Sequence, residues 1–245
     1  MTKRIIPTLL LKNGEFYKSR QFGDYVYLGD ACNIIRIFRE KDVDEFLILN
    51  IANEKIGEQT LKDLQKIVEE SFCPITFGGG IEDLGLARRV LHAGVERICF
   101  NSASFDYRLL QRAKSEFGAS TLSVCVDYSV ENGEYCLKKQ HMSHDRSFWD
   151  HVIHLNKLGL GDIVFQRMDL DGTRKGADFE VTRKLMAIDF KTPILLAGGV
   201  NGLEDLMQLK DNFANGLCVG SYFSLIGKYR APLITYKNPY SQGVR

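Results

Sequence analysis

Two aspartates stand at the ends of short apolar segments, a position that suits proton transfer. Asp127 closes the segment 122–127, and Asp169 follows the segment 162–168. A carboxyl group at such a place can donate or accept a proton, and acid–base sites often use two of them. We therefore predict Asp127 and Asp169 as catalytic candidates. For Asp127, capping or orienting a loop is the alternative interpretation.

Glycines and small polar residues follow other apolar segments and suggest anion binding. They are Gly78-Gly79-Gly80, Asn101-Ser102, Gly198-Gly199 and Gly220-Ser221. Glycine lets backbone N–H groups approach an oxyanion, and small polar residues before a helix add donors. The pattern predicts one phosphate site at Gly80, Asn101 and Ser102, and a second at Gly199, Gly220 and Ser221. Tight turns without a ligand are the alternative.

Four charged residues stand where apolar segments begin: Arg4, Glu45, Arg97 and Asp162. If they are buried they need partners, and two positive with two negative charges neutralise each other. The set predicts a charged ring at one end of the fold. Such a ring could be a gate, a structural plug, or exposed charges of little energetic value.

The elements that would position these residues alternate regularly. Eight apolar, strand-like segments lie at 4–11, 45–50, 75–78, 97–101, 122–127, 162–168, 194–197 and 216–220. Amphipathic, helix-like segments lie between them at 33–41, 60–70, 82–92, 105–117, 148–158, 179–188 and 203–210, with a short connection at 221–227. This order and length predict a (β/α)₈ TIM barrel, with a doubly wound open sheet as the alternative.

An internal repeat favours the barrel. The segment 73–81 resembles 192–200, and the same shift of 119 positions places Asn101-Ser102 on Gly220-Ser221 and Asn50 on Asp169. A shift of 117 places Leu10 on Asp127. We predict a single domain spanning 1–245, made of two half-barrels at about 1–118 and 119–245. The repeat partners of the two aspartates, Leu10 and Asn50, cannot ionise.

Composition narrows the classes of function. The 245 residues are 44% hydrophobic and 26% charged with a net charge of +1, which gives no reason to expect nucleic-acid or membrane-surface binding. No apolar run reaches about 18 residues. The six cysteines form no CxxC pair, so we expect reduced thiols and a cytoplasmic location. The pairs His141/His144 and His151/His154 lack further ligands, so we expect no metal and no cofactor.

The sequence resembles the cyclase subunit of imidazole glycerol phosphate synthase, HisF, over about residues 3–221. The matching motifs are 3–7 (Lys-Arg-Ile-Ile-Pro), 78–81, 169–173 (Asp-Leu-Asp-Gly-Thr) and 198–199. The resemblance implies a HisH-like glutaminase on the N-terminal face of the barrel and ammonia passing through the barrel. It implies an ammonia gate at Arg4, Glu45, Arg97 and Asp162, and phosphate groups at the two glycine-rich sites. It adds Lys18, in the loop after the first strand, Gly172 and Thr173 to the substrate site.

One departure changes the expected activity. The family's cyclase uses two aspartates; Asp127 matches one, and Leu10 replaces the other. Losing a general acid or base costs about 10²–10⁴-fold in rate, so ordinary cyclase activity is not expected. Asn50 and Ala52 also differ from the family pattern.

This combination, with the tail 227–236, resembles HisF-like paralogues of bacterial surface-polysaccharide loci. It implies a subunit of a glutamine-dependent amidotransferase complex. That complex would conduct ammonia to an ATP-dependent sugar amidotransferase, which converts an acetamido to an acetamidino group for lipopolysaccharide. The alternatives are a working cyclase of histidine biosynthesis, which is a lyase, and a non-catalytic scaffold.

Overall fold

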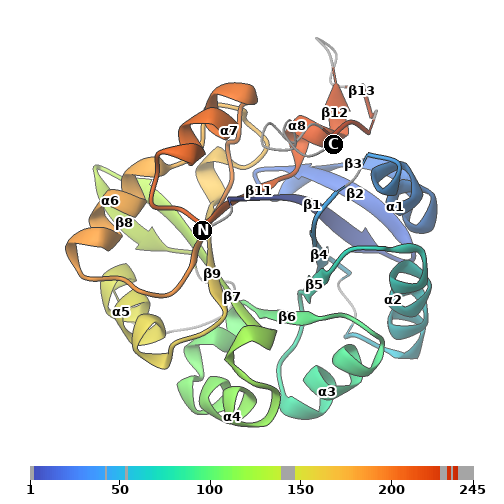
Figure 1. The fold of residues 1–245 in the computed structure, drawn as a ribbon, viewed down its shortest axis with the longest axis horizontal. Coiled ribbons are helices and arrows are strands. Elements are labelled where there is room, and N and C mark those ends of the chain that lie inside the picture. Colours follow the sequence, from blue (N-terminus) through green and yellow to red (C-terminus); the bar gives the residue numbers. More distant parts are fainter. Residues whose placement is uncertain are drawn as a thin grey trace, which may run out of the picture.

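Eight parallel strands close into a barrel in the computed structural model, which describes residues 3–41, 43–52, 55–138, 147–226, 231–232 and 234–236 (Figure 1). They are β1 (Arg4–Lys12), β4 (Phe46–Asn50), β5 (Ile75–Gly78), β6 (Arg97–Phe100), β7 (Leu122–Glu131), β9 (Asp162–Arg167), β10 (Ile194–Ala197) and β11 (Gly216–Val219). The last strand pairs with the first through Arg4 with Gly216 and Ile6 with Cys218. This closure confirms the predicted TIM barrel and excludes the open sheet.

The helices form a ring around the barrel (Figure 1). They are α1 (Ala31–Arg39), α2 (Glu58–Glu70), α3 (Leu84–His92), α4 (Tyr107–Phe117), α5 (Phe148–Leu158), α6 (Phe179–Ala187), α7 (Leu203–Lys210) and the short α8 (Ser221–Ser224). Several begin at a side chain that accepts a hydrogen bond from the first turn, such as Asp83 before α3 and Ser147 before α5. Short 3-10 turns η1 (Ser102–Phe105), η2 (Ala119–Thr121) and η3 (Met168–Leu170) follow or precede strands.

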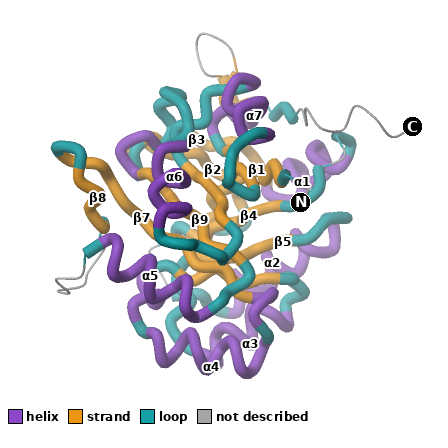
Figure 2. The backbone as a smooth tube through the Cα atoms, turned by 60° about the vertical axis from the view of Figure 1, so that its left-hand side comes forward, coloured by secondary structure: helices purple, strands orange, loops and turns teal. Residues whose placement is uncertain are grey.

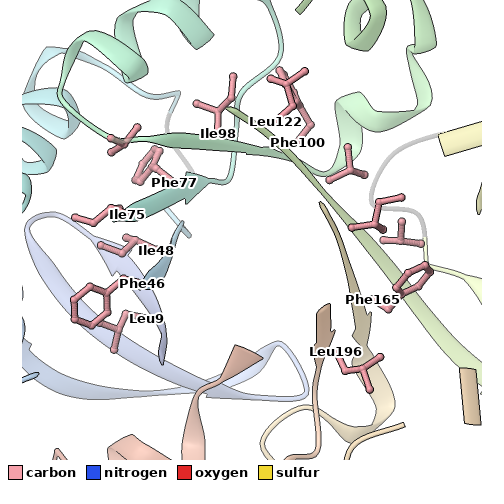
Figure 3. Packing of buried hydrophobic residues seen from close by; sticks show 14 of the residues in the cluster. Leu9, Phe46, Ile48, Ile75, Phe77, Ile98, Phe100, Leu122, Phe165 and Leu196 are labelled. Carbon is pink, nitrogen blue, oxygen red and sulfur yellow. The ribbon is translucent and has the colours of Figure 1, made fainter. Parts of the chain in front are cut away.

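Alternation along the strands divides the core into two layers. The larger layer lies between strands and helices and includes Leu9, Phe77, Phe100 and Phe165, which point outward from the barrel (Figure 3). The smaller layer fills the barrel interior and consists of Ile6, Leu47, Cys99, Cys125, Val164, Leu195, Ala197 and Cys218, with Leu49 packed against it. The interior at mid-height is therefore largely apolar, with thiols and the hydroxyls of Thr8 and Thr76, both register partners of Leu47, among its polar groups.

Two hairpins extend the barrel strands beyond its rim. β8 (Glu134–Leu137) pairs with β7 across the turn Asn132-Gly133 and projects from the body of the molecule (Figure 2). The other hairpin was not foreseen: β2 (Glu15–Arg20) pairs antiparallel with β1, and β3 (Gly23–Asp30) pairs with β2. Its turn, Asn13-Gly14, has φ of 54° and 76°, which Asn-Gly tolerates. Lys18 consequently lies on a strand and not in the predicted loop.

Some expectations fall at the margins of the described structure. His141 and His144 and most of the tail 227–236 lie outside the described residues, although β12 (Leu225–Ile226) pairs with β13 (Ala231–Pro232). His151 is buried in α5, with Nδ1 2.9 Å from the Tyr107 hydroxyl. Within the described ranges, no group of three side chains is placed to hold a metal ion. In the same ranges, no helix has the length and apolar character needed to cross a bilayer.

Candidate functional site

The four charged residues at the strand starts come together at the N-terminal end of the barrel. Arg4 donates to Glu45 (Nη1–Oε2, 3.3 Å) and to Asp162 (Nη2–Oδ2, 3.0 Å). Arg97 also pairs with Asp162 Oδ2, and its Nη1 is 3.9 Å from Glu45 Oε1. We call these four residues the charged ring. Each stands two positions before a residue of the interior layer, so strand alternation turns all four toward the barrel axis.

In the charged ring, burial and ion pairing shift the pKa values of the side chains in opposite directions. Burial disfavours the charge of Arg4, but its pKa is still raised because Glu45 and Asp162 lie beside it. The pKa of Glu45 is raised because burial outweighs the two nearby guanidinium groups. The Asp162 side chain is 1% exposed, whereas those of Arg4 and Arg97 are each 25% exposed. The ring thus combines two positive with two negative groups, and its arginines are partly exposed at the N-terminal face.

Asp127 lies at the opposite, C-terminal end of the barrel. It does not end its strand as predicted, because β7 continues to Glu131, and its register partner on β9 is Gln166. Burial raises the pKa of Asp127 to about 6, although hydrogen bonds from Asn101 and Cys125 act against that shift. The Cys125 Sγ–Asp127 Oδ1 distance is 3.5 Å. A carboxyl group that titrates near neutral pH can exchange protons with a ligand in the barrel mouth.

Leu10, the repeat partner of Asp127, has no ionisable group and so contributes no charge to this mouth. It lies on β1, 8% exposed, with Leu49 of β4 and Tyr17 of β2 as its register partners. Asn50 ends β4 and accepts from the backbone N–H of Ala52 at 3.4 Å. Among the residues compared through the repeat, the mouth therefore carries a carboxyl group at Asp127, on the β7 side, and uncharged side chains at Leu10 and Asn50.

Asp169 does not lie at a strand end, contrary to expectation. β9 stops at Arg167, and Asp169 sits in η3 with its side chain 37% exposed. Its carboxylate accepts from Arg167 at 3.2–3.3 Å. Arg167 also donates to Asp178 at 3.0 Å, and Asp178 caps α6 and accepts from Tyr128 at 2.9 Å. The ion pair with Arg167 holds the Asp169 carboxylate beside the C-terminal end of β9.

The second predicted phosphate site forms a small polar recess. The volume is about 20 Å³, room for about one water molecule. It is lined by Asp171, Gly172, Arg174, Gly199, Val200, Cys218, Gly220 and Ser221. The Ser221 hydroxyl is buried and has no hydrogen-bond partner among the described residues. Because Cys218 belongs to the interior layer, the recess reaches down to the barrel lining.

Close contacts surround two glycines of this recess, with a backbone atom at Gly199 and with a side chain at Gly220. A Cβ atom on Gly199 would lie 2.2 Å from the Gly176 carbonyl, and one on Gly220 would lie 2.8 Å from Lys18 Cε. Lys18 Nζ pairs with Asp171 Oδ1 at 3.1 Å, and both side chains are buried. The β2 strand thus brings a cation to the edge of the recess.

The first predicted phosphate site has a looser construction. Asn101 and Ser102 lie where β6 passes into η1, and the Asn101 amide donates to the Cys125 carbonyl at 3.3 Å. Gly80, on the neighbouring loop after β5, has a φ of 83° that favours glycine. Thr173, predicted with the substrate residues, donates to the Leu170 carbonyl at 2.7 Å and so stabilises its own turn.

Sequence reasoning missed several residues of this region, among them Asp171, Arg174 and Ser19. Arg174 lines the recess and bonds the carbonyls of Ser221 and Leu225, and Ser19 donates to Asp171 at 3.2 Å. Arg174 stands inside the motif after Asp169, and its basic side chain there was the available signal. Ser19 could be found only by recognising the hairpin.

Comparison with known proteins yields consistent matches. A family model described as "Histidine biosynthesis protein" matches residues 4–229. A protein of Leptospira borgpetersenii, provisionally named imidazole glycerol phosphate synthase subunit HisF, is 33% identical, covering 96% of this chain and 95% of its own. A Pseudomonas aeruginosa protein, provisionally named subunit hisF2 of the same synthase, is 32% identical with the same coverage. The subunit HisF of Dictyoglomus turgidum is 29% identical over 95% of this chain and 93% of its own.

Proposed function

The chain belongs to the histidine biosynthesis protein family, and on that premise we propose that it is the ammonia-conducting barrel subunit of a glutamine-dependent amidotransferase complex. A HisH-like glutaminase would dock on the N-terminal face and release ammonia at the charged ring. Ammonia would leave at the C-terminal face, where Asp127 and Asp169 line the exit. A sugar amidotransferase would use it there to convert an acetamido to an acetamidino group for surface polysaccharide.

One observation carries this proposal: the N-terminal end of the barrel has all four residues of the charged ring, whereas the C-terminal end lacks one of the two aspartates of the cyclase. At the N-terminal end, all four charged residues face inward and pair with one another. At the C-terminal end, the carboxyl pair that the cyclase reaction needs is reduced to Asp127, because Leu10 holds the other position. A conduit requires the ring and an apolar interior, and neither depends on a second proton-transfer group.

The interior favours neutral ammonia over charged species. Between the charged ring and Asp127 lie mainly aliphatic side chains and thiols, among them Cys99, Cys125 and Cys218, together with the hydroxyls of Thr8 and Thr76. Burial raises the pKa of all three thiols, that of Cys99 to about 12, so they remain uncharged. An ion would lose its hydration in such a layer at high cost, whereas a small neutral molecule would not. This contrast supports passage of NH₃ and exclusion of ammonium and other ions.

A substitution in the interior tests the conduit. In the complete complex, Val164→Phe places a ring in the barrel interior, and we expect the ratio of glutamine-dependent to ammonium-dependent product to fall at least tenfold. Ile163→Phe is the matched control, because the neighbouring residue on β9 packs toward the helices. The same ratio in Val164→Phe as in the control would refute the conduit. Arg97→Ala tests the ring in the same assay, and an unchanged ratio there would argue for a scaffold.

A working cyclase of histidine biosynthesis is the second candidate, supported by Asp127 and the recess at Gly220 and Ser221. In it, Asp127 would act alone as acid and base, and the phosphate groups of the substrate would bind at the two glycine-rich sites, helped by Lys18. Purified protein would then form imidazole glycerol phosphate from the cyclase substrate and free ammonium. Turnover at a rate normal for the family would replace the first proposal with this one.

A further inference from the structure

The charged ring leaves one carboxylate oxygen unused. Asp162 accepts from both arginines through the same atom, Oδ2. Its other oxygen, Oδ1, is buried and has no hydrogen-bond partner among the described residues. Buried carboxylate oxygens are normally hydrogen-bonded, so this atom requires an explanation.

A second buried oxygen without a partner lies beside it. Ser123 is the register partner of Asp162 on the adjacent strand β7, and each residue is 1% exposed. The Ser123 hydroxyl likewise makes no hydrogen bond of normal geometry within the described part of the chain, although its interaction with the Cys99 thiol acts against the raised pKa of that thiol. Both side chains face the barrel interior, because Cys125 and Val164, two positions further along, belong to the interior layer.

A thiol completes the row. Cys99 on β6 is the register partner of Ser123, so thiol, hydroxyl and carboxylate follow one another across three neighbouring strands. A thiol is a weak hydrogen-bonding group and leaves most of the bonding capacity of the hydroxyl unused. The row lies where the charged ring meets the apolar interior, which is the first position a molecule reaches after passing the ring.

From this row we propose a binding site for a single neutral ammonia molecule, formed by Ser123 Oγ and Asp162 Oδ1 just inside the charged ring. The inference rests on the proposed conduit and identifies the first binding site inside it. Ammonia has three N–H donors and one lone pair. Asp162 Oδ1 can accept one N–H, while the Ser123 hydroxyl can donate to the lone pair or accept another N–H.

The charge balance of the ring selects ammonia over ammonium. The negative charge of Asp162 is already shared with Arg4 and Arg97, whose guanidinium groups both contact Oδ2. An ammonium ion at Oδ1 would add a third positive charge close to these two. Neutral ammonia meets no such repulsion, and it gains hydrogen bonds that the aliphatic residues further along cannot offer.

The test is an isotope competition in the full complex of barrel, glutaminase and sugar amidotransferase. Amide-labelled ¹⁵N-glutamine and unlabelled ammonium chloride are supplied together, and mass spectrometry measures the glutamine-derived share of the product. We expect Ser123→Ala to lower the labelled-to-unlabelled ratio at least threefold, and Ser123→Thr, which keeps the hydroxyl, to restore most of it. Ser129→Ala is the matched control: a buried serine further along β7, bonded to Glu131 at 3.0 Å.

The outcomes separate this inference from the conduit itself. A ratio for Ser123→Ala equal to that of Ser129→Ala would refute the ammonia site. This would hold even if an ordered water were seen between Ser123 Oγ and Asp162 Oδ1. If Val164→Phe lowers the labelled-to-unlabelled ratio and Ser123→Ala does not, ammonia passes through the barrel but does not bind at Ser123 and Asp162. If neither variant changes the ratio, passage of ammonia through the barrel is refuted as well.

Discussion

At the C-terminal mouth of this barrel, a carboxyl group is present at Asp127 and absent at the repeat-related position Leu10. Asp127 has a pKa of about 6 because it is buried, and its repeat partner Leu10 has no ionisable atom. Proton transfer from two sides of a ligand needs two groups, so the mouth can support half of such a cycle. At the scale of single residues, position 10 therefore separates a conduit from a cyclase.

Restoring the missing carboxylate should restore cyclase chemistry if the rest of the mouth still binds the substrate. We expect Leu10→Asp to raise the formation of imidazole glycerol phosphate from the cyclase substrate and ammonium by about 10²–10⁴-fold, the usual contribution of a general acid or base. Leu10→Asn is the control, because asparagine has similar size and polarity but transfers no proton. An equal gain in both variants would show that proton transfer at this position is not the missing function.

The burial of Asp127 has a cost that depends on pH. Its pKa is about 6 in the folded protein against an ordinary 3.8, so between these values the folded state binds more protons than the unfolded state. The free energy of unfolding therefore falls as the pH rises through that window and levels off above it, by about 3 kcal/mol from this group. The Asp127→Asn variant has no group that titrates at this position and should not show this fall in the free energy of unfolding.

Chemical denaturation at pH 4 and pH 7 measures that contribution. We expect the stability of Asp127→Asn relative to wild type to be higher at pH 7 than at pH 4. Asp189→Asn, at a side chain 83% exposed, controls for general effects of removing a charge. A difference between wild type and Asp127→Asn that is the same at both pH values would contradict the raised pKa.

At the scale of elements, the β2–β3 hairpin is fastened to the loop that precedes α6. Asp171 accepts from Lys18 at 3.1 Å and from Ser19 at 3.2 Å, and its carbonyl accepts from the Gln21 N–H at 3.1 Å. A Cβ atom on Gly172 would lie 2.9 Å from the Ser19 carbonyl. These contacts hold Lys18 at the recess and make the hairpin one wall of the mouth.

Breaking the buried ion pair of this contact should loosen the hairpin. Lys18→Met leaves the Asp171 carboxylate buried with the Ser19 hydroxyl as a side-chain donor, and removal of one buried partner costs about 3–5 kcal/mol. Hydrogen exchange should show faster exchange in β2 and β3, while β5 and β6 keep their protection. The double variant Lys18→Met/Asp171→Leu should be less destabilised than Lys18→Met. If it is more destabilised, the pair is not the fastening contact.

The sequence predicts the barrel strands well because they are buried on both sides. Continuous apolar segments such as 75–78 and 194–197 match β5 and β10 residue for residue. The β2–β3 hairpin escaped prediction because β3 is largely exposed and has no apolar alternation. Asn13-Gly14 offered the signal, since it stands 119 positions before Asn132-Gly133, the shift of the internal repeat.

Side-chain pairing explains the part of the site that sequence could not give. The position of Asp169 depends on Arg167, which lies only two residues away but is oriented by Asp178 and Tyr128. The unused oxygens of Ser123 and Asp162 depend on strand register, which a sequence does not state. The charge set of the ring could be predicted because its members stand at the same end of their strands.

At the scale of the whole molecule, the two barrel ends present different surfaces. The N-terminal face carries the charged ring and, in the loops that precede β5 and β11, the exposed aromatic residues Phe72 (71%) and Phe213 (58%). A groove of about 240 Å³ beside Phe72 is lined by Val68, Ser71, Phe72, Cys73, Pro74, Ile75 and Glu96. The guanidinium of Arg39 lies 3.5 Å from the centre of the Phe72 ring. Exposed aromatic side chains next to a groove are typical anchors of a protein interface.

These aromatic residues should anchor the glutaminase if ammonia enters at the charged ring. We expect Phe72→Ser and Phe213→Ser each to weaken binding of the glutaminase at least tenfold in calorimetry, since loss of a central aromatic contact costs about 1–2 kcal/mol or more. Tyr25→Ser is the control, because Tyr25 is 52% exposed on β3, at the opposite end of the barrel. Weakening by Tyr25→Ser alone would put the partner on the C-terminal face, where ammonia could not enter through the ring. The direction of transport therefore depends on which of these surfaces the glutaminase covers.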